Sequence, residues 1–194
     1  MTRRLPFRLR ALRARDLPTI IYLERLIFDE PWPERMFVQE LYTNPHAHYY
    51  VLELTDPALI RPRSTRRGAA DAKILGYVGL RVNRKEGHIS TLAVRPTWQG
   101  HGLGELLLTS ALRRAYENRA EFMALEVRVT NDVARALYKK YEFEEIARVR
   151  GYYGDIDGYR MRLAPLDAAY AARLRERRAA LLARLREEFG TSET

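Results

Sequence analysis

Three closely spaced glycines mark the part of this sequence that is best suited to hold a ligand. They are Gly100, Gly102 and Gly104, and they lie between an apolar strand pattern that ends at Val94 and an apolar helix pattern. Glycine lets successive backbone N–H groups turn toward one side, and a helix N-terminus adds a positive partial charge. The segment 99–104 is therefore predicted to bind a diphosphate, and the alternative is an ordinary turn between a strand and a helix.

This segment differs from both of the common nucleotide-binding loops. A P-loop carries a lysine followed by serine or threonine, and a dinucleotide-binding fold places its glycines after the first strand of a βαβ unit. No lysine occurs in 99–104, and several strand patterns precede it. The sequence therefore disfavours a nucleoside triphosphate or NAD as the ligand.

Glu126 and Tyr138 are polar side chains on the strand and the helix that follow. Because side chains alternate along a strand, Leu125 and Val127 face one side of the predicted sheet and Glu126 faces the other. The Glu126 carboxylate can line a cleft, or it can simply face solvent. Tyr138 lies seven residues after Asn131, about two turns along the helix. Its hydroxyl can belong to a functional site, or Tyr138 can be a core tyrosine whose hydroxyl bonds the backbone.

The elements that must position these residues form a mixed α/β pattern. Some segments are rich in β-formers, whereas others carry apolar residues at helical spacing. This order predicts one domain over residues 1–165, with a largely antiparallel sheet and helices on both of its faces. Strands are expected at 7–14, 49–54, 74–82, 88–94, 122–128, 143–150 and 159–163, and helices from 16 to before 31, at 34–42, from the glycines to about 117, and after 131.

Two segments stand apart from this core. Residues 56–73 combine Pro, Arg, Ser, Gly and Ala without periodicity, so they are predicted to form a mobile hairpin loop. Within residues 166–194, apolar residues near heptad spacing predict a single amphipathic helix. These residues are Tyr170, Leu174, Leu181, Leu185 and Phe189.

Composition narrows the class of protein. The 194 residues include no cysteine, which excludes disulfides, thiolate metal sites and a cysteine nucleophile. No metal-ligand spacing of histidines is present either. No uncharged run approaches the ~20 residues that a membrane span requires, and the first residues lack an apolar leader segment, so a cytoplasmic protein without a metal is expected.

The net charge of +9 is concentrated in two segments. Residues 1–15 hold six arginines and residues 61–67 hold four, so the rest of the chain is close to neutral. Such segments favour weak, salt-sensitive contacts with RNA-rich assemblies such as the ribosome. Nucleic-acid binding is therefore not expected to be the main activity.

Four separated motifs resemble the GNAT N-acetyltransferases, especially the RimI-type protein N-terminal acetyltransferases and their archaeal relatives. Gln99, Gly102 and Gly104 fit the Q/R-x-x-G-x-G/A signature, after a strand that ends with residues 91–94. The other motifs are Leu-Glu-Val-Arg at 125–128 followed by Asn131, Ala-Leu-Tyr at 136–138, and Gly-Tyr-Tyr at 151–153. The resemblance covers about residues 7–165 and implies the GNAT fold. One departure is Glu142, where many relatives have Gly or Asn, the residues that a left-handed turn prefers.

By this resemblance, the cosubstrate is acetyl-CoA. The main chain of 92–94 would meet the pantetheine arm and the thioester, and the segment 99–104 would hold the pyrophosphate. Asn131 would lie near the thioester, and a helix N-cap is its alternative role. The implied cofactor-binding residues are Leu92, Ala93, Val94, Gln99, Gly100, His101, Gly102, Leu103, Gly104 and Asn131.

The resemblance also implies roles in catalysis. Acetyl transfer to an amine needs a neutral nitrogen and a proton for the departing thiolate. Glu126 corresponds to the general base of the RimI-type enzymes and Tyr138 to their general acid, with His88 as a reserve candidate for moving the amine proton. The acceptor would be enclosed by Phe28, Trp32, Tyr152 and Tyr153, although Trp32 fits a core position equally well.

The chemistry of amines favours a protein N-terminus as the acceptor. An α-amine of pKa ~8 is roughly one-tenth neutral at pH 7, whereas a lysine of pKa ~10.4 is neutral in about one molecule in 2,500. We therefore expect an acetyltransferase of protein N-termini, with the alanine of a ribosomal small-subunit protein suggested by the resemblance. Two alternatives stay open: acetylation of a small-molecule amine or a lysine, and a non-catalytic CoA-binding module docked on a ribosome.

Overall fold

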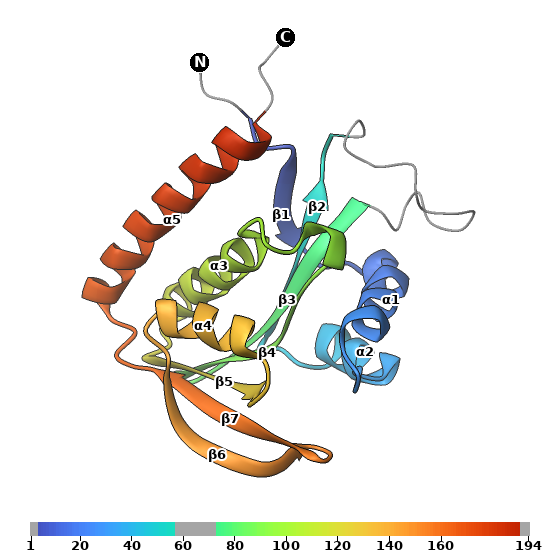
Figure 1. Ribbon diagram of the computed structural model, residues 1–194, viewed down its shortest axis with the longest axis vertical. Helices are drawn as coiled ribbons and strands as arrows, with labels where there is room; N and C mark the ends of the chain where they lie inside the picture. The colour runs from blue at the N-terminus through green and yellow to red at the C-terminus, as the bar shows by residue number, and fades with distance from the viewer. Residues whose placement is uncertain (1–3, 57–72, 191–194) are drawn as a thin grey trace.

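The computed structural model describes residues 4–56 and 73–190, and it contains a seven-stranded sheet in the order β1-β2-β3-β4-β5-β7-β6 (Figure 1). Neighbouring strands are antiparallel except β4 and β5, which are parallel. The mixed, mostly antiparallel architecture confirms the fold class expected from the sequence. The strands are β1 (Phe7–Ala11), β2 (Ala47–Leu54), β3 (Ile74–Asn83), β4 (Glu86–Val94), β5 (Phe122–Arg128), β6 (Glu144–Tyr153) and β7 (Ile156–Leu163).

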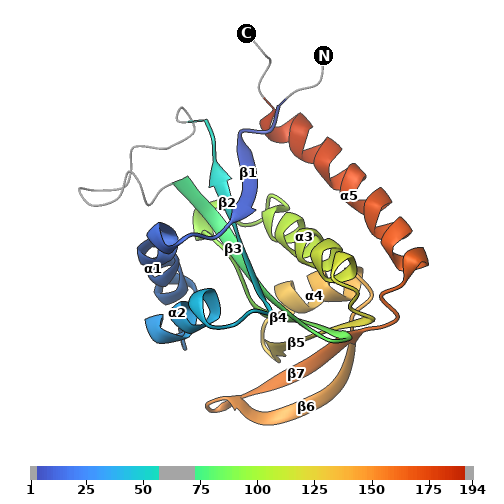
Figure 2. The same ribbon diagram turned by 180° about the vertical axis from the view of Figure 1, so that it is seen from behind.

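Helices cover both faces of the sheet (Figures 1 and 2). On one face, α1 (Leu17–Ile27) and α2 (Glu34–Tyr42) bury Ile20, Leu23 and Phe37 against the sheet residue Tyr77. On the other face lie α3 (Leu103–Glu117), α4 (Asp132–Lys140) and α5 (Ala168–Phe189). Their apolar faces share one core with the sheet. The amphipathic helix expected after residue 165 is therefore confirmed as α5, which packs against α3.

The parallel strands β4 and β5 separate part-way along the sheet. They pair from Glu86 with Phe122 as far as Ile89 with Leu125. Beyond that point β4 continues to pair with β3 as far as Val94, and β5 pairs with β7. The end of β4 and the second half of β5 are therefore not paired with each other, and this break in the ladder is called the strand opening.

Some element boundaries differ from those expected. β1 ends at Ala11 rather than at residue 14, because the chain turns there into the short 3-10 helix η1 (Ala14–Asp16). β6 and β7 extend toward each other to a tight turn in which Gly154 has a φ of +60°. The loop expected at 56–73 and the arginines at 61–67 lie almost wholly outside the described residues.

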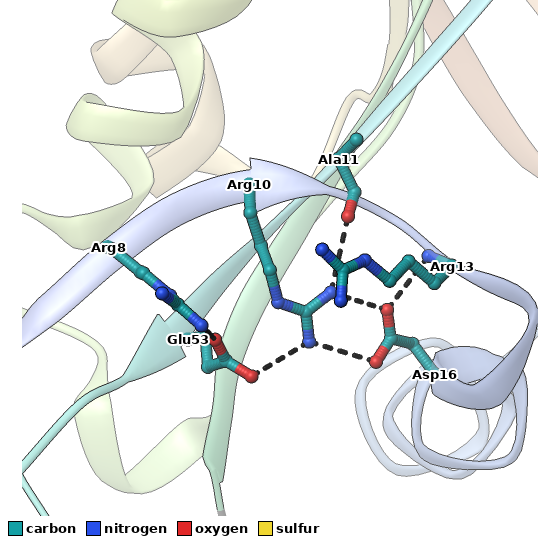
Figure 3. A network of polar contacts seen from close by, with 6 residues as sticks. All are labelled: Arg8, Arg10, Ala11, Arg13, Asp16 and Glu53. Carbon is teal, nitrogen blue, oxygen red and sulfur yellow. Dashed lines mark hydrogen bonds and ion pairs between the residues drawn. The ribbon is translucent and has the colours of Figure 1, made fainter.

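A network of arginines and carboxylates fastens the N-terminal strand (Figure 3). Arg10 forms two hydrogen bonds to Asp16, of 2.6 and 2.9 Å, and a third of 2.9 Å to Glu53 on β2. Arg8 pairs with the same Glu53 at 2.8 Å. These contacts lower the pKa of Glu53 to about 2, and the hydrogen bond from Arg10 has the largest effect. Part of the basic N-terminal segment therefore serves the fold rather than a partner.

Candidate active site

A histidine and a glutamate meet where β4 and β5 separate. His88 lies on the paired part of β4, and Glu126 follows the last β5 residue that pairs with β4. Nε2 of His88 is 2.8 Å from Oε2 of Glu126, and Nε of Arg160 on β7 is 3.2 Å from Oε1. The Glu126 side chain is only 10% exposed. As expected from the strand alternation, Leu125 and Val127 face the opposite side and are buried.

The surroundings of Glu126 keep its carboxylate ionised. The hydrogen bond with His88 has the largest effect, and Arg160 and Tyr152 act in the same direction, so the pKa of Glu126 falls to about 2. Such a carboxylate accepts a proton poorly at neutral pH, whereas imidazole ordinarily exchanges a proton in that range. The contact with Glu126 fixes the orientation of the His88 ring, an arrangement that suits a base with an orienting partner.

Tyr138 lies on the inner side of α4, with its ring centroid 5.8 Å from that of Phe143. Burial raises the pKa of Tyr138 to about 12, so the phenol keeps its proton at neutral pH. Tyr153 is electrostatically coupled to both Tyr138 and Glu126, and its own pKa is raised, mainly by burial. The tyrosine of α4 and the carboxylate of β5 therefore both act electrostatically on Tyr153, which connects the Tyr138 phenol with the His88 and Glu126 pair.

The glycine segment has the backbone geometry of a cradle. Gly100 and Gly102 have φ values of +83° and +81°, in the left-handed region, and α3 begins directly after Gly102. Gln99 stabilises the turn through a 2.9 Å hydrogen bond from its amide nitrogen to the carbonyl of Val94. The N–H groups of the first turn of α3 have no partner within the helix, so the turn and the end of β4 offer hydrogen-bond donors beside the strand opening.

The remaining residues expected at the cofactor site occupy varied positions. Ala93, Val94 and Leu103 are buried, Leu92 is half-buried, and Gly104 lies within the first turn of α3. His101 is turned toward α5, where it contacts Glu188. Asn131 accepts a 3.1 Å hydrogen bond from the N–H of Ala134, which confirms the alternative role of N-cap.

Of the four aromatic residues expected at the acceptor site, two lie on β6 and two lie in the segment between α1 and α2. Tyr152 is 43% exposed, and its ring centroid lies 4.9 Å from that of Tyr153 at the end of β6. Phe28 and Trp32, in the segment between α1 and α2, are half-buried, and Trp32 packs against Phe37 with ring centroids 5.6 Å apart. Trp32 thus contributes to the core, which is one of the two roles expected for it from the sequence.

One ion pair and one close contact tie the segment between α1 and α2 to its neighbours. Asp29, in the α1–α2 segment, pairs with Arg128 of β5 at 2.5 Å. The neighbouring Glu30 lies so close to the β6–β7 turn that a Cβ on Gly154 would come within 2.7 Å of Oε1. The α1–α2 segment therefore lies against both the end of β5 and the β6–β7 turn.

Sequence reasoning missed Arg160, Arg128 with Asp29, and Glu24. Glu24 is 2% exposed, accepts a hydrogen bond from the N–H of Trp32 at 3.1 Å and contacts the hydroxyl of Tyr77. Burial raises the pKa of Glu24 to about 7. Its place on the apolar face of α1 was a usable signal. Arg160 offered none, because its contact with Glu126 depends on the pairing of β5 with β7.

Two other kinds of feature are absent from the described residues. Within residues 4–56 and 73–190, no cluster of three or more histidine or carboxylate side chains is arranged to hold a metal ion. None of the helices in those ranges is both long and apolar enough to cross a membrane.

Comparison with known proteins places this geometry in a family. The model of the Acetyltransferase (GNAT) family matches residues 17–143, a range that includes the glycine segment, His88, Glu126 and Tyr138. This chain belongs to the GNAT acetyltransferase family. The family match ends before β6, so β6, β7 and α5 lie outside it.

Similar GNAT proteins are named as acetyltransferases of protein N-termini. The N-alpha-acetyltransferase RimI of Mycobacterium tuberculosis is 34% identical over 165 residues, which cover 81% of this chain and 92% of the relative. An N-alpha-acetyltransferase of Sulfurisphaera tokodaii is 30% identical over 173 residues, covering 82% and 93%. Among solved structures, the ribosomal-protein-S18-alanine N-acetyltransferase of Escherichia coli superposes with a TM-score of 0.68 at 26% identity, over 84% of this chain and 96% of the neighbour.

Proposed function

We propose that this protein transfers the acetyl group of acetyl-CoA directly to the N-terminal α-amine of a protein, within a ternary complex. The observation that carries the proposal is the hydrogen-bonded pair of His88 and Glu126 at the opening between β4 and β5. The pair lies in the same sheet as the end of β4, which leads into the glycine segment. The names of similar proteins support the α-amine as the acceptor class, and the alanine of ribosomal protein S18 as the first acceptor to test.

The residues present fit acetyl-CoA, which supplies the activated acetyl thioester when it is bound. The left-handed glycines and the start of α3 suit the diphosphate, since they direct N–H groups and a positive helix end to one place. The backbone of Leu92, Ala93 and Val94 borders the strand opening. It suits the pantetheine arm, because it can hydrogen-bond that arm as it would a neighbouring strand. Asn131 and the exposed Gly100 are assigned to the rim of this site.

The acceptor amine must lose a proton before it can attack. Passing the proton of an α-ammonium of pKa ~8 to a carboxylate whose pKa is about 2 costs about 8 kcal/mol. The proton therefore goes to His88, and Glu126 orients the imidazole and stabilises the charge that it gains. Tyr138, which keeps its proton at neutral pH, is assigned to protonate the departing thiolate.

Recognition of the acceptor is assigned to the two aromatic segments. Phe28, Trp32, Tyr152 and Tyr153 are assigned to the walls of the acceptor site, because Tyr152 interacts with Glu126 and aromatic side chains suit the first side chain of a peptide. A cytoplasmic location and a weak, salt-sensitive contact of arginine-rich segments with the ribosome complete the proposal. Arg8 and Arg10 contribute little to such a ribosome contact, because both are paired with Glu53.

Mass spectrometry of a peptide library tests the acceptor. The protein is incubated with acetyl-CoA and peptides that have a free N-terminus, the same peptides blocked at the N-terminus but carrying lysine, or polyamines. We expect acetylation of the free α-amines, with blocked peptides and polyamines unmodified. Preferential acetylation of lysines or polyamines would refute the acceptor, and binding of acetyl-CoA without transfer to any amine would favour a non-catalytic module.

A further inference from the structure

The helix α5 is fastened to the rest of the protein near its middle by a residue in an unusual conformation. Glu142, which follows α4, has a φ of +65°, in the region that favours glycine or asparagine. Its carboxylate forms ion pairs of 2.8 Å with both Arg173 and Arg177 of α5. A glycine at residue 142 would adopt the turn more easily but could not make these contacts.

The last two turns of α5 contact the glycine segment. A Cβ placed on Gly102 would lie 2.6 Å from a guanidinium nitrogen of Arg184 and 3.3 Å from Leu181, so the helix lies directly against the turn. Glu188 contacts the imidazole of His101. Phe189 packs edge-on against the same imidazole at 5.5 Å and lies 5.8 Å from the ring of Trp98. Both ends of the turn are therefore braced by α5.

Arg184 also compensates a negative charge that would oppose a diphosphate. Glu105 lies in the first turn of α3, where a carboxylate repels an anion bound at the helix N-terminus. The carboxylate is held by Lys140 at 2.6 Å, by the hydroxyl of Tyr141 at 2.6 Å and by Arg184 at 3.3 Å. Two cations thus flank one carboxylate, and the start of α3 keeps its attraction for phosphate.

We propose that α5 is a positioning element of the acetyl-CoA site, with Arg184 neutralising Glu105 and Phe189 holding the glycine segment in its binding shape. This inference rests on the proposed function of that segment. It extends the site beyond residues 17–143, the range that the family match covers. Arg184 acts on the cofactor through Glu105 and the turn, so it is a positioning residue and not a catalytic one.

Substitution of Arg184 tests the electrostatic part. In Arg184→Gln we expect roughly five- to tenfold weaker binding of CoA by titration calorimetry, because one compensating charge near the diphosphate is lost. The KM for acetyl-CoA should rise by the same factor, with kcat and the KM for the peptide unchanged. Arg184→Lys should recover most of the affinity, and Glu105→Gln should restore binding in the Arg184→Gln background. The matched control is Arg175→Gln, an exposed arginine of the same helix about 13 Å away along its axis.

Phe189→Ala tests the mechanical part without changing a charge. Amide hydrogen exchange of 98–104 should become faster in this variant even without ligand, and CoA binding should weaken several-fold. If the unmodified protein binds and transfers normally while Arg184→Gln and Phe189→Ala keep its affinity for CoA, α5 is not part of the site. If the unmodified protein binds no acetyl-CoA, the proposed function fails instead, and faster exchange in Phe189→Ala would still measure the bracing of the turn.

Discussion

Replacing Glu126 with Gln should separate the role of its charge from that of its shape. The pKa of Glu126 falls from 4.5 to about 2, which corresponds to about 3 kcal/mol of favourable interaction between the carboxylate and its neighbours. His88 makes the largest of these contributions, and Arg160 and Tyr152 share the rest. Glu126→Gln removes the carboxylate that orients His88, and we predict a roughly thirtyfold lower kcat, which corresponds to about 2 kcal/mol of transition-state stabilisation.

The assay is the steady-state rate with a free N-terminal peptide at saturating acetyl-CoA. The KM for acetyl-CoA should stay the same, because the proposed role of Glu126 is to orient His88 and not to bind the phosphates. Glu145→Gln is the control, since Glu145 also forms ion pairs of 2.9 Å, with Arg135 and Lys139, but makes none with His88. A folded Glu126→Gln protein with a kcat within twofold of the original would refute the assignment of the His88 and Glu126 pair.

Three further outcomes follow from other pKa values. Tyr138 has a pKa of about 12 and is proposed as the proton donor, so Tyr138→Phe should lower kcat roughly tenfold with little change in Tm; an unchanged kcat would exclude that role. Glu24 has a pKa raised to about 7 by burial, so the fold should lose up to about 3 kcal/mol as the pH rises from about 4.5 to 7. Glu24→Gln should lack that loss, and parallel Tm curves from pH 5 to 8 would contradict it. Glu53 has a pKa lowered to about 2, so its contribution is present above its ordinary pKa of about 4.5 and lost as the pH falls toward 2, by about 1 kcal/mol after solvent screening. Tm measured at pH 6 and 3 should therefore fall more in the original protein than in Glu53→Gln.

Local patterns were sufficient to predict most of the fold. The boundaries of α2 and β5 agree with the expected 34–42 and 122–128, because proline or asparagine residues bound α2 and strong β-formers fill β5. The left-handed position of Glu142 was also indicated, since relatives place Gly or Asn there. Each of these features depends on residues that are close in the sequence.

The contacts that build the candidate site could not be read in the same way. His88 and Glu126 are 38 residues apart, and their side chains meet only because β4 and β5 pair in parallel and then separate. The contact of Glu126 with Arg160 requires a particular register of β5 and β7. The heptad-like spacing in α5 predicted a helix, but not that Arg184 would lie against Gly102. Such contacts are decided by topology and packing rather than by local pattern.

Hydrogen exchange with a conjugate of CoA joined to a peptide α-amine tests the central claim most directly. The claim is that the cofactor lies along the end of β4 and the glycine segment, and that the acceptor amine faces His88 and Glu126. We expect slower exchange in 92–94, in 99–104, in β5 from Glu126 onward and in the α1–α2 segment. Protection confined to other surfaces, with these segments unchanged at saturating conjugate, would contradict the account.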